Sequence, residues 1–108
     1  MIVSGGENVF PQEVEAVILT LDTVREAAVV GVPDDDFGQR LRAVIVAAGP
    51  APTEDEVREH VRRNLARFKV PRDVVFRDTL PRNTTGKILR RVLVEEAAPQ
   101  PPPDPPAR

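Results

Sequence analysis

Residues 24–46, VREAAVVGVPDDDFGQRLRAVIV, decide the fold. They contain two runs rich in valine, isoleucine and alanine, and the first run closes at Pro33, where the acidic turn DDDFGQ begins. Runs of β-branched residues bounded by proline, glycine and aspartate are typical of strands. We therefore expect two paired strands here, over residues 24–32 and 41–49.

Helical patterns lie on both sides of these strands. Residues 11–21, PQEVEAVILTL, start with a proline suited to a first helical turn and carry apolar residues at helical spacing. Residues 53–68, TEDEVREHVRRNLARF, combine a single apolar stripe with Thr53 and Glu56 in the pattern of a capping box. Both segments are expected to be helices.

The remaining elements complete an αββαβα order. A third short strand is expected over residues 73–76, DVVF, and a last helix over residues 88–98, ILRRVLVEEAA. This order predicts the α+β class, with a small three-stranded sheet flanked by helices. The expected core includes Val29, Val30, Val44, Ile45, Val61, Leu65, Val75 and Leu89.

The C-terminal end has a different composition. Residues 1–97 are expected to form one domain, and residues 98–108, APQPPPDPPAR, a disordered Pro-rich tail, because this segment has no apolar anchors. A chain of 108 residues leaves room for only one modest core.

Composition excludes several classes of function. With no cysteine and one histidine, the chain cannot form a disulfide framework or a thiolate metal site. A net charge of -2 disfavours nucleic-acid binding, which stays a weaker alternative because of the basic stretches RRNLARFK and GKILRR. No apolar stretch approaches the length of a membrane span, and no signal peptide is recognisable, so a cytoplasmic protein is expected.

A lysine stands out near the end of the predicted domain. The segment NTTGK places Lys87 between a loop and the expected N-terminus of the last helix. Helix N-termini favour anions, so helix stability does not explain a cation there. Two interpretations remain: Lys87 is an ordinary exposed lysine, or it presents a charge to an external phosphate or carboxylate.

Four segments carry a resemblance to a known family. They are MIVSGGENVFPQEVE, VVGVPDDDFGQRLRAVIV, ARFKVPRDVVF and LPRNTTGKILRR. In this order and at these spacings the chain resembles the C-terminal domain of AMP-forming acyl-CoA synthetases, which belong to the adenylate-forming ligases. The resemblance covers nearly everything before the proline tail.

The resemblance implies a reaction in two steps. A carboxylate and ATP form an acyl-adenylate, and the thiol of CoA then displaces AMP. Lys87 matches the family's catalytic lysine, which stabilises charge during the first step. The small domain then rotates, and the loop containing Ser4, Gly5, Gly6 and Glu7 is implied to face the second step.

Other positions are implied to lie near the CoA nucleotide. These are Phe68, Lys69 and Arg72, while some relatives carry a basic residue where this chain has Val70. Structural alternatives stay open: the two glycines would also suit a tight turn, and Phe68 would also suit the core.

The family's large N-terminal domain has no counterpart in this sequence. The resemblance implies that this domain binds most of the ATP or AMP and CoA, with Mg²⁺ accompanying ATP and no metal ligands in this chain. The acid is expected to be a fatty or aryl acid. Three interpretations stay open: a ligase domain that works with a large domain in cis or in trans, a free-standing binding or regulatory module, and a non-catalytic gene fragment.

Overall fold

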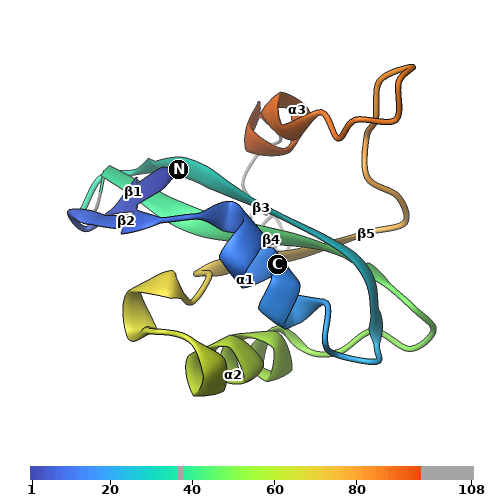
Figure 1. Cartoon of the computed structure of the whole chain (residues 1–108), viewed down its shortest axis with the longest axis horizontal. Coiled ribbons are helices and arrows are strands. Elements are labelled where there is room, and N and C mark those ends of the chain that lie inside the picture. Colours follow the sequence, from blue (N-terminus) through green and yellow to red (C-terminus); the bar gives the residue numbers. More distant parts are fainter. Residues whose placement is uncertain (37, 96–108) are drawn as a thin grey trace, which may run out of the picture.

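A three-stranded sheet forms the centre of the fold (Figure 1). The computed structural model describes residues 1–36 and 38–95. The middle strand, β4 (Gly38–Ala47), is antiparallel to β3 (Val24–Asp34) and parallel to β5 (Asp73–Arg77). A parallel pair needs a crossover connection, and a helical segment supplies it between β4 and β5. The predicted α+β class and three-stranded sheet are confirmed.

Three α-helices and one short 3-10 helix surround the sheet. They are α1 (Pro11–Ile18), α2 (Glu54–Asn64), η1 (Arg67–Lys69) and α3 (Arg90–Glu95). The predicted capping box begins α2: the Glu56 amide donates to Thr53 Oγ1 at 3.0 Å, and the Thr53 amide donates to Glu56 Oε1 at 2.8 Å.

Several predicted helix ends were wrong. Residue 65 adopts an extended backbone with φ -136° and ψ 168°, so α2 stops before it and η1 follows as a separate turn. The last helix starts at Arg90, because Ile88 pairs with Arg82 in an isolated antiparallel bridge. The first helix ends at Ile18 rather than at residue 21.

The end of the chain lies outside the described residues. This applies to the predicted tail, residues 98–108, and to the last part of the helix expected up to residue 98. Within the described ranges, no helix is long and apolar enough to cross a membrane.

A short N-terminal hairpin is an addition to the predicted order. It consists of β1 (Ile2–Ser4) and β2 (Glu7–Val9), joined by a two-residue turn. Gly5 and Gly6 occupy this turn with φ values of 58° and 84°. Positive φ at both turn residues is the geometry that follows the natural twist of a two-residue hairpin, and glycine adopts it without strain.

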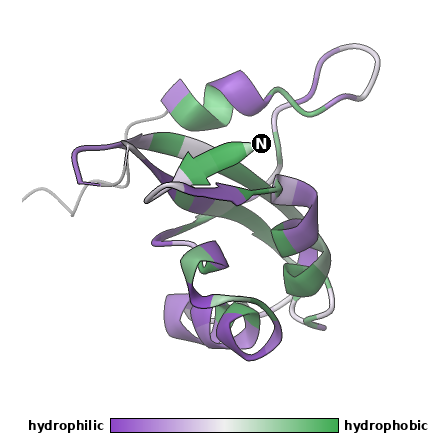
Figure 2. Ribbon diagram, turned by 60° about the vertical axis from the view of Figure 1, so that its left-hand side comes forward, coloured by the Kyte–Doolittle hydropathy of each residue, from purple (hydrophilic) through white to green (hydrophobic). Residues whose placement is uncertain are grey.

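The sheet is covered on both faces. Figure 1 shows α1 and α2 on one side of it and α3 on the other. Alternate residues of β3 and β4 therefore belong to two cores, one under the hairpin, α1 and α2, and one under α3 and the segment around Leu80. In Figure 2, hydrophobic colour follows the strands and hydrophilic colour covers the outer side of α2.

The core predictions can be compared residue by residue. Val29, Val30, Val44, Ile45 and Val61 are buried. The other three predicted core residues, Leu65, Val75 and Leu89, are half-buried. Their neighbours Val74 and Leu93 take the fully covered positions in β5 and α3.

A buried arginine ties α3 to the sheet. Arg42, on β4, donates to Asp73 Oδ2 at 3.2 Å and to the carbonyl oxygen of Leu93 at 3.1 Å. Arg40 shares the same carboxylate at 3.0 and 3.1 Å, and this hydrogen bond to Asp73 raises the pKa of Arg40. The contacts fix one end of the helix that follows Lys87.

Candidate functional site

Lys87 lies on a closed loop, residues 83–87, which projects from the sheet and is here called the Lys87 loop. Asn83 closes the loop: its amide donates to the Lys87 carbonyl at 3.0 Å, and its Oδ1 accepts from the Lys87 amide at 3.0 Å. Gly86, with φ 87°, completes the turn, and its amide donates to the Asn83 carbonyl at 3.0 Å. Backbone hydrogen bonds therefore define the position from which the Lys87 side chain extends.

Two arginines brace this loop against the edge strand β3. Arg82 donates from Nη1 to the Gly86 carbonyl at 2.9 Å and from Nη2 to Glu26 Oε1 at 2.5 Å. Arg90 donates to Glu15 Oε2 at 2.8 Å and to the Val29 carbonyl at 3.0 Å. The loop is thus held at both of its ends.

The Lys87 side chain itself is left exposed. Across residues 1–36 and 38–95, no hydrogen bond or ion pair engages its ammonium group. Its place differs from the predicted junction with a helix, because two residues, Ile88 and Leu89, separate it from Arg90, where α3 starts. The loop, rather than a helix terminus, positions the charge.

A second group of predicted residues meets at the hairpin turn. A pocket of about 290 Å³, here called the hairpin pocket, lies between the turn, β4 and η1. Its lining residues are Ser4, Gly5, Glu7, Leu41, Arg67, Phe68, Val70 and Arg72. The structure therefore brings together five predicted residues from two distant segments: Ser4, Gly5, Glu7, Phe68 and Arg72.

Gly6, Phe68 and Lys69 differ in their relation to this pocket. Gly6 belongs to the turn but not to the lining. Phe68 is 38% exposed and lies outside the two cores, so its ring faces the pocket rather than the interior. Lys69 does not line the pocket: its Nζ pairs with Glu13 Oε1 at 2.6 Å, which joins η1 to α1.

The Lys87 loop and the hairpin lie at different ends of the fold. In Figure 1 the hairpin β1–β2 is at the left, whereas the loop before α3 projects at the upper right. No residue of the loop lines the hairpin pocket. The two sets of candidate residues therefore face different surroundings.

Sequence reasoning missed Arg67. It lines the hairpin pocket, whereas the expected helix over residues 53–68 would have placed it on an ordinary solvated face. Pro71 could have indicated an earlier end of this helix, because helices commonly end shortly before a proline. A separate turn at residues 67–69 follows from that earlier end.

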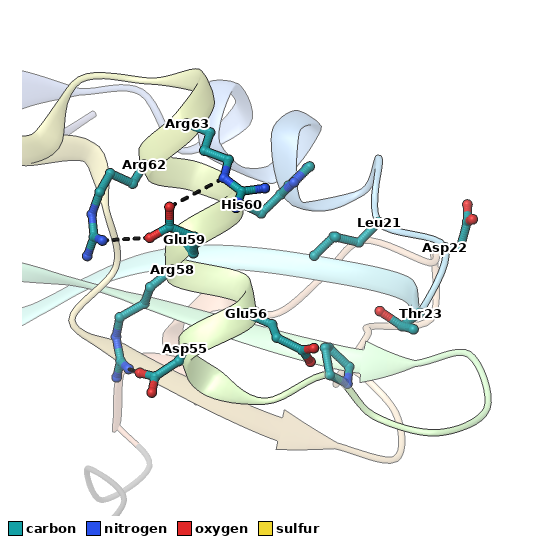
Figure 3. Close-up of a pocket in the computed structure, with 11 residues that line it drawn as sticks. Leu21, Asp22, Thr23, Asp55, Glu56, Arg58, Glu59, His60, Arg62 and Arg63 are labelled. Atoms are coloured by element: carbon teal, nitrogen blue, oxygen red, sulfur yellow. Dashed lines mark hydrogen bonds and ion pairs between the residues drawn. The ribbon is translucent and has the colours of Figure 1, made fainter.

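A larger, open pocket of about 740 Å³ lies along α2 (Figure 3). Several of its charged groups pair with one another: Arg62 donates to Glu59 at 2.6 Å and Arg63 donates to it at 3.3 Å, as the dashed lines in Figure 3 show. His60 also has a structural contact, since its Nε2 lies 2.6 Å from Thr20 Oγ1 beside α1. These pairings are those of a solvated helix surface.

Comparison with known proteins identifies the domain. The model of the AMP-binding enzyme C-terminal domain matches residues 13–87. A long-chain-fatty-acid–CoA ligase of Mycobacterium tuberculosis is 46% identical over 96 residues, which are 89% of this chain and 19% of the relative. A 2-succinylbenzoate–CoA ligase of Bacillus cereus is 45% identical over 93 residues, 86% of this chain and 19% of the relative.

A solved structure agrees with these relatives. A fatty acyl CoA synthetase of Mycobacterium tuberculosis superposes with a TM-score of 0.85 at 45% identity, over 91% of this chain and 20% of that one. The chain spans about a fifth of the length of the relatives it matches. By this family match and these relatives, the chain belongs to the AMP-binding enzyme C-terminal domain family.

Proposed function

We propose that this chain is the mobile domain of an acid–thiol ligase and serves both half-reactions, each with a different face. The observation that carries the proposal is that the Lys87 loop and the hairpin pocket lie at different ends of the fold. An exposed cation stands on a braced loop at one end of the fold, and a glycine turn forms a pocket at the other. The domain is taken to be residues 1–97, and the acid to be a fatty or aryl acid, like those in the names of the relatives.

In the first half-reaction, the carboxylate oxygen of the acid attacks the α-phosphorus of ATP, and pyrophosphate leaves. Negative charge is redistributed over the phosphoryl oxygens as this bond forms and the other breaks. The Lys87 ammonium would stabilise that charge without accepting or donating a proton. Its bonded loop supports this role, because a fixed charge in a closed site costs no reorganisation during the reaction.

In the second half-reaction, the CoA thiol attacks the acyl carbon and AMP leaves. The hairpin pocket would hold the thiol-bearing arm of CoA. Gly5 has no side chain to obstruct a thin ligand, and Phe68 adds an apolar wall with Arg72 beside it. These features fit a long, mostly uncharged arm that ends in a phosphorylated nucleotide.

The proposed function requires a large domain, in cis or in trans, that binds most of the ATP, with its Mg²⁺, and the acid. The test is to measure acid-dependent pyrophosphate release with the chain alone, the large domain alone, and the two together or fused. We expect release well above either component only when both are present. Release by the chain alone would contradict the proposal, and equal release by the large domain with and without the chain would favour a binding module or a non-catalytic fragment.

A further inference from the structure

A pocket at one end of the sheet belongs to neither group of candidate residues. Its volume is about 820 Å³, and it is here called the strand-end pocket. Its lining includes Arg25 of β3, Phe76 and Arg77 of β5, and Asp78 and Thr79, which follow β5. In Figure 1 the start of β3, the end of β5 and the Lys87 loop all lie on the right of the molecule.

A β-bulge places Arg25 and Glu26 on the same face of the sheet. The pairing register of β3 shifts between Val24 and Glu26, so Arg25 is the extra residue of the bulge. Val24 and Ala27 both belong to the core under the hairpin, α1 and α2. Residues 25 and 26 therefore both lie on the opposite face, which is covered by α3 and the segment that leads to the Lys87 loop.

The two charges of the bulge are engaged differently. Glu26 accepts a hydrogen bond from Arg82 at 2.5 Å, and this ion pair braces the Lys87 loop. Arg25 is exposed, and within residues 1–36 and 38–95 its side chain makes no hydrogen bond or ion pair. Because Arg25 is next to Glu26 in the chain, the strand-end pocket adjoins the base of the Lys87 loop.

The chemistry of this pocket favours a protein partner that carries a carboxylate. Among the described residues that line it, Arg25 and Arg77 carry positive charge and Asp78 alone carries negative charge. Phe76 is 38% exposed and adds an apolar ring, which a small inorganic anion does not need. Arginine and aromatic residues are enriched in protein–protein interfaces, and a guanidinium binds a carboxylate through two parallel hydrogen bonds.

We propose that the strand-end pocket receives an acidic side chain of the large domain when Lys87 enters the active site. Lys87 acts there only if its end of the fold faces the large domain, so Arg25 faces the same partner. The ion pair made by Arg25 holds the orientation for adenylation and separates when the hairpin turns toward the active site. Arg25 is thus a positioning residue, and the inference rests on the proposed function, because it takes Lys87 as the charge used in the first half-reaction.

The test titrates the 108-residue chain into a fixed amount of large domain and measures acid-dependent pyrophosphate release. The chain concentration that gives half of the maximal rate reports assembly, and the maximal rate reports the chemical step. Arg25→Ala should raise the half-maximal concentration about fivefold, and Arg25→Glu about tenfold or more, because two negative charges then meet. The maximal rate should stay the same, and about 0.5 M NaCl should reduce the difference between the proteins.

Thioester formation from supplied acyl-adenylate is the second readout. Its half-maximal chain concentration should not change in the Arg25→Glu protein, whereas a general loss of stability would raise it as well. The matched control is Arg63→Glu, which reverses the charge of an exposed arginine of α2 that does not line the strand-end pocket. This control should leave both half-maximal concentrations unchanged. In a fused enzyme, Arg25→Glu should instead slow adenylation and leave thioester formation intact.

The outcomes separate the inference from the function on which it rests. Equal half-maximal concentrations of the Arg25→Glu and Arg63→Glu proteins in pyrophosphate release would overturn the inference. The proposed role of Lys87 would stand in that case if Lys87→Ala still lowered the maximal rate. An unchanged maximal rate in the Lys87→Ala protein would overturn both. Equal weakening of the two half-reactions by Arg25→Glu would also overturn the inference, since the ion pair would then not be specific to adenylation.

Discussion

The Lys87 loop and the hairpin turn are built in different ways. Side-chain as well as backbone hydrogen bonds hold the loop: Asn83 closes it, and Arg82 joins it to Glu26, so the Lys87 charge extends from a fixed base. The hairpin is held by its own backbone pairing and a glycine turn. One region presents a charge and the other presents bare backbone, which fits the proposal that one small domain serves two chemical steps.

The largest expected effect is that of Lys87→Ala in a ligase assembled from this chain and a large domain. Adenylation should fall by about 10²-fold or more, because one preorganised charge is lost from the transition state. Thioester formation from supplied acyl-adenylate should be nearly unchanged. Pyrophosphate release and thioester formation, measured separately, test this difference.

The control for this substitution is Arg91→Ala, which removes a cation that is 81% exposed on α3. It should leave both steps unchanged. Equal loss of both half-reactions in the Lys87→Ala enzyme would show that the two regions do not act separately.

Gly6→Leu should have the reverse effect and a smaller one. A Cβ at residue 6 would meet no atom within 4 Å, but the φ of 84° strains a residue with a side chain. We expect thioester formation to fall about tenfold, from about 1–2 kcal/mol of strain and the added bulk at the turn. Adenylation should persist.

Gly6→Ala separates these two causes, because it introduces the strain without the bulk. A thioester rate as low as that of Gly6→Leu would assign the effect to the turn geometry. A loss of adenylation in either variant would argue against a hairpin that serves only the second step.

Gly31→Val tests whether the packing of the hairpin against β3 matters for thioester formation. A Cβ at residue 31 would lie 2.8 Å from Ile2 Cγ2 and 2.9 Å from Gln39 Nε2, so the side chains of Ile2 in the hairpin and of Gln39 must shift. Overpacking of this kind costs about 1–3 kcal/mol of stability, measured by denaturant unfolding. Thioester formation should fall more than adenylation.

The companion variant is Ile2→Ala, which makes room below residue 31. The double variant should lose less stability than the sum of the two single losses, because the residues are in contact. Additive losses would mean that Ile2 and Gly31 do not share this contact.

Arg82→Ala tests the bracing of the Lys87 loop. The substitution removes the hydrogen bonds to the Gly86 carbonyl and to Glu26. A net loss of about 1 kcal/mol in holding the loop corresponds to about a fivefold slower adenylation. Arg82→Lys, which keeps a charge near Glu26, should recover part of the rate, whereas an unchanged rate in Arg82→Ala would show that the backbone of the loop is sufficient.

The predictability of the fold follows from what each segment encodes locally. The β-branched runs of β3 and β4 and the capping box at Thr53 determine their elements through neighbouring residues. The hairpin has only three residues in each strand, which is too short for a visible alternation. The half-burial of Val75 and the burial of Val74 depend on which parts of the folded chain pack on each face of β5, and this is a tertiary property.

The candidate sites were predictable to different degrees. Four motifs indicated Lys87 and the Gly5–Gly6 segment, but no local pattern indicates that η1 lies against the hairpin turn. Arg67 became a candidate only because α2 ends at Asn64 and the next turn faces the pocket. The pairing state of an arginine depends on residues brought together by folding.

The smallest effect on the ratio of the two half-reaction rates is expected from Thr53→Ala. The variant loses the hydrogen bond that Thr53 Oγ1 accepts from the Glu56 amide, so α2 and the domain should lose about 1 kcal/mol of stability. Thermal unfolding should show a midpoint lower by about 4–8 °C. Thr53 does not line the hairpin pocket and does not belong to the Lys87 loop. The ratio of the two half-reaction rates should therefore stay the same below that midpoint. A changed ratio would mean that general loss of stability affects one face more than the other, and the separate effects of Lys87→Ala and Gly6→Leu would then need correction for it.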